Sequence, residues 1–407
     1  MLKEKFNFEE LKNKEIDNFP IRKDHFNKFI EQGFPNKRLE QWKFSDLNTI
    51  LNTNIKNFKF GFNKIIKKID KQNVIKNFEH SKIFIVNGVL SLIDILEVDK
   101  DKIQIKNENL IYDQEKNNSL NNLNLALSNR LIRINVLDGQ IVEKPLVIYN
   151  IYNSYEETNF INSRFEITLE KNSSLSMLSV FDEKIKNCFS NLHSKIILNQ
   201  NSHLKNYIFD NNFNENLKYN FSNIDIYENS VSENFIYSSE SKFSKNEIIC
   251  NLKEKYSSAF INGVINLDQS KQHEIQTNIN HLAENTKSYQ LIKSILNDKS
   301  KGVYQGKIFV NEIAQKTDGY QLSKALLLDE NTEFNGKPEL EIYADDVKCS
   351  HGSTSGNLDE NAIFYLMSRG LDFKQAKKLL IEGFINDVIE KITNTEIQTY
   401  IKGEMKI

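Results

Sequence analysis

A short turn recurs at nearly constant spacing through the middle of the chain, and this repeat restricts the possible folds more than any other feature. The turn reads EKNSSL, NQNSHL, YENSVS, KEKYSSA and AENTKS, and its hydroxyl residue falls at Ser173, Ser202, Ser230, Ser257 and Thr286. The steps are 29, 28, 27 and 29 residues. Self-similarity at a period of about 20 to 50 residues indicates stacked units, each of which buries its apolar face against the next.

The segments between and before these turns have the composition of short β-strands. LIRINV, PLVIYNIY, SRFEITLE, SLSMLSVF, SKIILN and HLKNYIF are rich in β-branched and aromatic residues, and several alternate polar with apolar residues. Asn suits the turns because its short side chain tolerates the left-handed backbone conformation. Units made only of strands predict a β-solenoid, in which the turn hydroxyls stack along one edge at about 4.8 Å per coil.

Both ends of the chain show helical patterns instead. FNFEELKNKEIDNF and RKDHFNKFIEQGF place apolar residues at helical spacing, and Trp42 nearby is expected to be a buried anchor for these helices. The predicted organisation is a mostly helical region at 1–130, a β-solenoid at 131–356 and a helical region at 357–407.

Two helices are predicted after the solenoid, in NLDENAIFYLMSRG and LDFKQAKKLLIEGFINDVIEKI. We expect the first to begin with a capping box of Asn357 and Glu360, and the second with one of Asp372 and Gln375. The apolar residues of the second helix recur at a spacing that places them on one face: Ala376, Leu379, Leu380, Phe384 and Val388.

Composition narrows the range of partners. The 53 basic and 55 acidic residues nearly balance, which argues against nucleic acid or an anionic membrane as the main partner. The first twenty residues lack the apolar core of a signal peptide, and no run approaches the roughly 18 apolar residues that span a bilayer. Cys188, Cys250 and Cys349 lie far apart with no CxxC pair, which predicts reduced thiols in a cytoplasmic protein.

The stretch KCSHGSTSG, residues 348–356, concentrates the chemically active residue types. It is not a Walker A phosphate loop, because Gly352 and Gly356 are one residue too close and no Lys follows. No other stretch supplies that motif. We therefore expect that this chain does not hydrolyse ATP by itself.

Cys349 and His351 are both good ligands for zinc or for iron–sulfur chemistry, and on a strand they would share a face. A closed site needs about four ligands, and no second Cys/His pair lies nearby in the sequence. The pair is therefore either half of a site that another subunit completes, or an inward-packed Cys beside a surface His. A nucleophile–base pair is less favoured, because neighbours on one strand cannot hold a substrate between them.

Other candidate groups carry weaker signals. Asp345 and Asp346 invite an interpretation as a carboxylate dyad, but consecutive strand residues face opposite ways. Cys188 and Cys250 are expected to be small buried hydrophobes. The remaining histidines show no ligand spacing and are expected to have structural or solvent-exposed roles: His25, His80, His193, His203, His273 and His281.

The run LEIYADDVKCSHGSTSGNLDENAIFYLMSRG resembles the C-terminal signature of the SufB/SufD family of iron–sulfur cluster assembly proteins. The likeness extends upstream through QHEIQTNINHLAENTKSYQL and covers about residues 272 to 390. The N-terminal FPNKRLEQWKFSDL and the modest length are similar to the SufD branch. The alternatives are a SufB-type scaffold and, in a different class, a β-helical carbohydrate-active protein.

The resemblance implies a right-handed parallel β-helix between helical ends, in a cytoplasmic complex with SufB and the ABC-type ATPase SufC. SufB would pair through the ends of the β-helices, and the C-terminal helices would dock on SufC. A homodimer is possible in isolation, and a cysteine desulfurase system would act indirectly. The chain would be a non-catalytic subunit, and a flavin is possible in the complex.

The resemblance also assigns a site. A nascent iron–sulfur cluster, shared with SufB, would form at the junction of the two subunits. His351 of the C-S-H-G motif would be a ligand there, with Cys349 as its neighbour and iron as the metal. The glycine-rich residues after His351 would form the corner between the last strand and the first docking helix.

Overall fold

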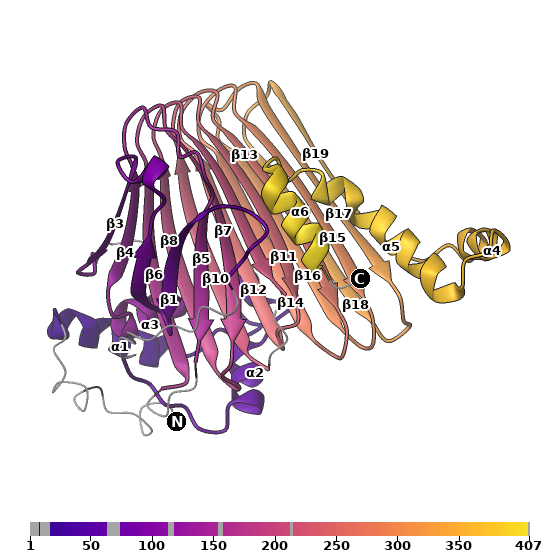
Figure 1. The fold of residues 1–407 in the computed structure, drawn as a ribbon, viewed down its shortest axis with the longest axis horizontal. Coiled ribbons are helices and arrows are strands. Elements are labelled where there is room, and N and C mark those ends of the chain that lie inside the picture. The colour runs from indigo at the N-terminus through magenta and orange to yellow at the C-terminus, as the bar shows by residue number, and fades with distance from the viewer. Residues whose placement is uncertain are drawn as a thin grey trace.

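The computed structural model describes residues 8, 17–62, 74–112, 118–153, 158–211 and 215–405. Its body is a parallel β-solenoid with two long sheets, and each coil contributes one strand to each sheet (Figure 1). This confirms the mainly β solenoid expected from the repeat.

Sheet A has the strand order β19-β17-β15-β13-β11-β9-β7-β5-β1-β2, and sheet B has the order β18-β16-β14-β12-β10-β8-β6-β4-β3. The strands of sheet A are β1 (Ser81–Val86), β2 (Val89–Asp94), β5 (Leu146–Tyr152), β7 (Ser174–Glu183), β9 (His203–Asp210), β11 (Val231–Ser239), β13 (Ser258–Leu267), β15 (Lys287–Leu296), β17 (Thr317–Leu327) and β19 (Val347–Asn357). The strands of sheet B are β3 (Ile103–Glu108), β4 (Leu131–Val136), β6 (Phe160–Leu169), β8 (Phe189–Leu198), β10 (Leu217–Ile226), β12 (Phe243–Leu252), β14 (Gln272–His281), β16 (Lys301–Val310) and β18 (Glu333–Ile342).

The recurring turn lies between a strand of sheet B and the next strand of sheet A, and it stacks from coil to coil as expected. The hydroxyl oxygens of Ser202 and Ser230 are 3.4 Å apart, and those of Thr286 and Thr317 are 3.3 Å apart. Thr317 thus adds a further unit to the repeat. The residue before each hydroxyl has a left-handed backbone in every turn, and it is Asn in four of them: Asn172, Asn201, Asn229 and Asn285.

Side chains alternate along each strand between the lumen of the solenoid and its outer faces. The lumen side chains form one continuous, mostly aliphatic core, in which neighbouring strands such as β10 and β12 pair over ten residues without a shift. A one-residue slip would move every apolar side chain to the opposite face, so the buried lumen maintains the register.

The N-terminal helices cover the outer face of sheet B. They are α1 (Phe19–Gln32), the 3-10 helix η2 (Glu40–Trp42), α2 (Leu47–Asn54) and α3 (Ser119–Leu127); a second 3-10 helix, η3, spans Glu97–Asp99. Trp42 is buried, 4.6 Å from the Lys245 ammonium, which confirms its expected anchoring role. Residues 1–130 also supply β1, β2 and β3, so both sheets begin before residue 131.

The C-terminal helices are α4 (Glu360–Ser368), α5 (Phe373–Ile389) and α6 (Thr395–Glu404). α5 and α6 pack on the outer face of sheet A, whereas α4 projects away from the solenoid (Figure 1).

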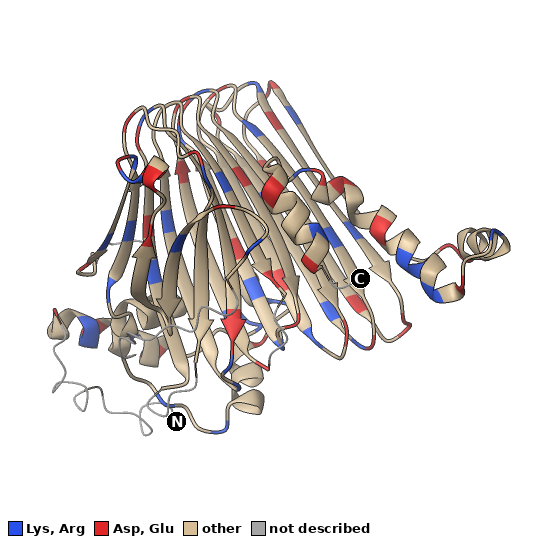
Figure 2. Cartoon of the chain, viewed as in Figure 1, with Lys and Arg blue, Asp and Glu red and all other residues tan. Residues whose placement is uncertain are grey.

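Basic and acidic residues are interspersed over the molecule (Figure 2). Among the described residues, the helices are all too short or too polar to cross a bilayer.

Candidate functional site

The stretch KCSHGSTSG forms most of β19, the last strand of the solenoid. The prediction that its glycines form a corner is therefore wrong, because Gly352 and Gly356 lie within the strand. They pair with Leu322 and Leu326 of β17. A β-carbon added at Gly352 would lie 3.0 Å from the Leu322 side chain. Gly352 thus serves close packing on the outer face, and the glycines do not turn the chain.

Cys349 and His351 share the lumen face of β19, as expected. Cys349 pairs with Gly319 and His351 pairs with Gln321, which is fully buried in the lumen. Residues at paired positions of parallel strands point to the same side of the sheet. His351 is nevertheless exposed, because no further coil covers it among the described residues.

The two ends of the solenoid are finished differently. At the N-terminal end, β2 and β3 pair antiparallel with β1 and β4 and cover the first coil. At the C-terminal end, β18 pairs only with β16 and β19 only with β17 within the described part of the chain. No residue of either last strand is buried, and most of β19 is exposed. Such an edge presents unpaired backbone groups and invites pairing with another chain.

The Cys349 thiol is half-buried at this open end, where it packs against a buried cluster of Ile308, Val310, Ala314 and Ala344. Burial raises its pKa above the ordinary value, and the nearby Asp318 carboxylate acts in the same direction. A protonated thiol is a weak ligand and a weak nucleophile. The exposed imidazole of His351 is therefore the more available ligand of the pair.

Cys349 and His351 do not complete a metal site within the described part of the chain. Among the described residues there is no group of three or more His, Cys, Asp and Glu side chains that could hold a metal ion. Asp345 and Asp346 lie in the exposed connection between β18 and β19, and the backbone N–H of Asp346 donates to the side chain of Gln315. Any metal bound by Cys349 and His351 would therefore need further ligands from outside the described residues.

The remaining candidates have the structural roles expected of them. Cys188 and Cys250 are fully buried. His203 is partly exposed beside Glu233, at 2.8 Å. The other histidines are buried and hydrogen-bonded to polar groups of the chain: His25, His80, His193, His273 and His281.

The second feature that suits a partner lies on α4 and α5, which we call the C-terminal arm. α4 has no buried residue, and Phe364, Tyr365 and Met367 on it are exposed. Phe373 and Leu379 of α5 are exposed as well. An isolated exposed apolar residue is ordinary, but a group of them on adjacent helices is typical of an interaction surface.

The helix caps are confirmed in one case and corrected in the other. Asp372 and Gln375 form the expected capping box at the start of α5. The cap of α4 is Asp359, whose carboxylate accepts from the backbone N–H of Asn361. Asn357 cannot serve there because it still belongs to β19.

The apolar stripe expected on α5 is confirmed in part. Of the expected residues, Ala376 and Val388 are buried and Phe384 packs against the cluster on sheet A, whereas Leu379 is exposed. Ile381, Ile385 and Ile389 complete the packed face.

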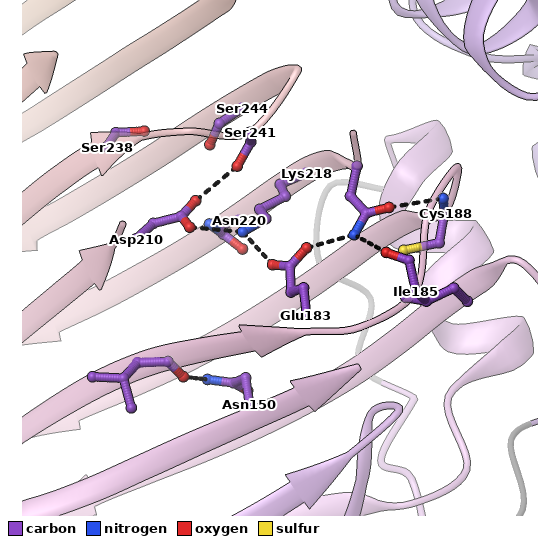
Figure 3. A network of polar contacts seen from close by, with 12 residues as sticks. Asn150, Glu183, Ile185, Cys188, Asp210, Lys218, Asn220, Ser238, Ser241 and Ser244 are labelled. Atoms are coloured by element: carbon purple, nitrogen blue, oxygen red, sulfur yellow. Dashed lines mark hydrogen bonds and ion pairs between the residues drawn. The ribbon is translucent and has the colours of Figure 1, made fainter. Parts of the chain in front are cut away.

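The sequence analysis did not predict a buried ion network, which lies in the lumen where the strands meet the return loops (Figure 3). Lys218 is fully buried and contacts the carboxylates of Glu183 and of Asp210, the latter at 2.8 Å. Asn216 donates to Glu183 at 2.6 Å and accepts from the backbone N–H of Cys188. These residues come from three successive coils, and no motif spacing relates them. The network joins the return loops of the coils.

Comparison with known proteins places the chain in a family. A family model described as "SUF system FeS cluster assembly, SufBD core domain" matches residues 151–384. The chain is 25% identical over 393 residues to "Iron-sulfur cluster assembly protein SufD" of Escherichia coli K12, which covers 94% of this chain and 91% of that protein.

The chain also has two shorter matches. The chloroplastic protein ABCI7 of Arabidopsis thaliana is 46% identical over 72 residues, or 18% of this chain and 15% of that protein. An iron-sulfur cluster assembly SufBD family protein of Synechocystis is 34% identical over 109 residues, or 27% of this chain and 24% of that protein. The chain belongs to the SufB/SufD family of iron–sulfur cluster assembly proteins, and within it to the SufD branch.

Proposed function

We propose that the chain is a non-catalytic scaffold subunit that supports the formation of nascent iron–sulfur clusters at its junction with SufB. The observation that carries the proposal is the open C-terminal end of the solenoid, where His351 is exposed beside the half-buried Cys349 on the lumen face. A second solenoid end placed against β18 and β19 would cover both side chains. It would also supply the ligands that this chain lacks.

The roles of the two ligands differ in the proposal. A neutral imidazole binds iron through a ring nitrogen without losing a proton first. A thiol must become a thiolate before it binds a metal, and the raised pKa of Cys349 opposes this step. His351 is therefore the primary ligand and Cys349 the secondary one. Ligand donation transfers no electrons, so the step assigned to this chain needs no flavin.

The proposal includes two partner surfaces. The unpaired edges of β18 and β19 receive SufB, and in isolation the same end is expected to pair two copies of this chain.

The exposed apolar residues of α4 and α5 bind the SufC ATPase, which supplies the ATP hydrolysis for which this chain has no Walker A motif. A cysteine desulfurase system delivers sulfur to the complex. Three free thiols suit a cytoplasmic location.

The decisive experiment replaces His351 in the co-expressed complex with SufB and SufC. His351→Ala should leave the complex intact on gel filtration, because the side chain is exposed. It should lower the iron and sulfide bound after anaerobic reconstitution with a desulfurase several-fold. Cys349→Ala should have a smaller effect.

Ser350→Ala is the matched control, since Ser350 lies between the two ligands and faces the opposite side of β19. Full cluster formation by His351→Ala would show that the histidine is only a surface residue.

A further inference from the structure

A group of buried polar side chains interrupts the aliphatic lumen directly behind His351. Tyr304 of β16 has its hydroxyl 3.2 Å from Gln290 Oε1 of β15 and 3.4 Å from Gln321 Oε1 of β17. The hydroxyl of Thr277 on β14 lies 3.4 Å from the same Tyr304 oxygen. These four side chains are at most 1% exposed. We call them the lumen polar cluster.

Packing alone does not explain the lumen polar cluster. Gln290 Nε2 is buried and has no hydrogen-bond partner among the described contacts. An unpaired buried amide costs about 1 to 3 kcal/mol. In the preceding coil the same position is Ile261, which fills the lumen without that cost.

A glycine next to the lumen polar cluster leaves space for its polar groups. A β-carbon added at Gly306 of β16 would overlap both Tyr304 Oη and Gln321 Oε1. Gly306 has no left-handed backbone that would require glycine. The missing side chain of Gly306 therefore leaves the space that the polar groups of Tyr304 and Gln321 occupy.

The lumen polar cluster ends at His351. Ile261, Gln290, Gln321 and His351 form one row across β13, β15, β17 and β19, each residue paired with the next. Adjacent strands lie about 4.8 Å apart, so the Gln321 amide is the lateral neighbour of the imidazole. Gln321 Nε2 donates to the backbone carbonyl of Glu339 on β18 at 3.2 Å. Tyr304 on one side and β18 on the other hold this amide in place.

We infer that Gln321 is a positioning residue for His351, an inference that rests on the proposed function. A histidine that binds a metal usually donates its other ring N–H to an oxygen, which sets both the tautomer and the ring orientation. An amide oxygen has two lone pairs and can accept from Tyr304 and from His351 together. Gln321 would thus hold the imidazole with its unprotonated nitrogen directed out of the open end, toward the iron.

The test compares two substitutions at Gln321. Gln321→Met keeps approximately the volume but removes the acceptor, whereas Gln321→Glu retains an acceptor oxygen. Leu322→Met, on the opposite face of β17, is the matched control. Urea unfolding of each variant first establishes that the solenoid is folded.

The first readout is the tautomer of His351 in the full isolated chain, from ring nitrogen and carbon NMR signals assigned with His351→Ala. One tautomer should dominate in the wild type and in Gln321→Glu, and Gln321→Met should show a mixture. The second readout is iron and sulfide in the reconstituted complex, which Gln321→Met should lower several-fold and Gln321→Glu should largely restore.

The outcomes separate this inference from the proposed function. If Gln321→Met leaves either readout at the wild-type value while His351→Ala abolishes cluster formation, the positioning role is overturned and the proposed function stands. If His351→Ala itself supports full cluster formation, the proposed function fails first and the positioning role with it.

Discussion

Cys349 lies on β19 directly beside Gly319 of β17, and its sulfur is 3.3 Å from the place where a β-carbon on Gly319 would stand. The absent side chain leaves the space into which the thiol is turned. Cys349 is therefore half-buried while His351, two residues further along the same face, is exposed. The open end of the solenoid thus presents one sheltered thiol and one accessible imidazole.

This arrangement predicts the reactivity of the three thiols. In the native chain only Cys349 should react with Ellman's reagent, because Cys188 and Cys250 are fully buried, and Cys349→Ala should abolish the reaction. The raised pKa of Cys349 keeps the thiolate fraction small at neutral pH, so the rate should still increase above pH 9. Bound SufB should protect the thiol. Equal labelling with and without SufB would place the SufB interface elsewhere.

The second prediction concerns the C-terminal arm. Leu379 is 48% exposed on α5, so Leu379→Asp should change the melting temperature by no more than a few degrees. It should nevertheless abolish co-purification with SufC, because a charge would then be buried in an apolar interface. Leu380 is a poorer choice because it is partly buried. Asn386→Asp, which adds the same charge at another exposed position of α5, should retain SufC; unchanged binding by Leu379→Asp would refute this interface.

The third prediction concerns the buried ion network. Burial raises the pKa of Glu183 despite the opposing charge of Lys218. Burial alone would lower the pKa of Lys218, but the carboxylates of Asp210 and Glu183 outweigh it and raise that pKa. Lys218→Met leaves these carboxylates buried without their cation, so it should cost about 3 to 5 kcal/mol in the free energy of unfolding.

Urea unfolding at pH 7 measures this cost. Lys253→Met is the control, since Lys253 forms a partly exposed pair with Asp225 at 2.8 Å, and such pairs contribute less than about 1 kcal/mol. Equal losses in the two variants would mean that the buried network adds no stability beyond a surface pair.

The fourth prediction is a pH dependence of stability. Burial lowers the pKa of His281 to about 3, and its ring nitrogens contact Thr286 and Ser288 at 2.7 and 2.9 Å. Below the unfolded value of about 6.5, the unfolded chain binds a proton that the folded chain does not. Stability should therefore fall with pH from about 6.5 toward 3, by roughly 1.4 kcal/mol per unit for this histidine.

Urea unfolding at pH 7 and pH 5 separates the contribution of His281 from that of other groups. His281→Gln keeps a polar side chain but cannot titrate, so it should lose about 2 kcal/mol less than the wild type between these two pH values. The absolute stability of the variant at pH 7 does not enter this comparison. An identical loss in both proteins would show that His281 is protonated in the folded state.

The sequence alone determined those features that depend on local pattern or on repetition. The spacing of Ser173, Ser202 and Ser230 identified a solenoid, because a stacked turn must recur once per coil. The alternation of Cys349 and His351 placed both on one face, because strand side chains have a period of two. The capping box of Asp372 and Gln375 was readable because its bonds join residues three apart.

Only the tertiary structure decided the features that depend on lateral neighbours. The glycines of KCSHGSTSG suggested a turn, but pairing with β17 holds them in a strand, and the first cap moves to Asp359 as a result. The contacts of Lys218 with Glu183 and Asp210, and of Tyr304 with Gln321, join side chains from different coils. The length of each return loop decides which residues meet across the lumen, and no local pattern in the sequence encodes that offset.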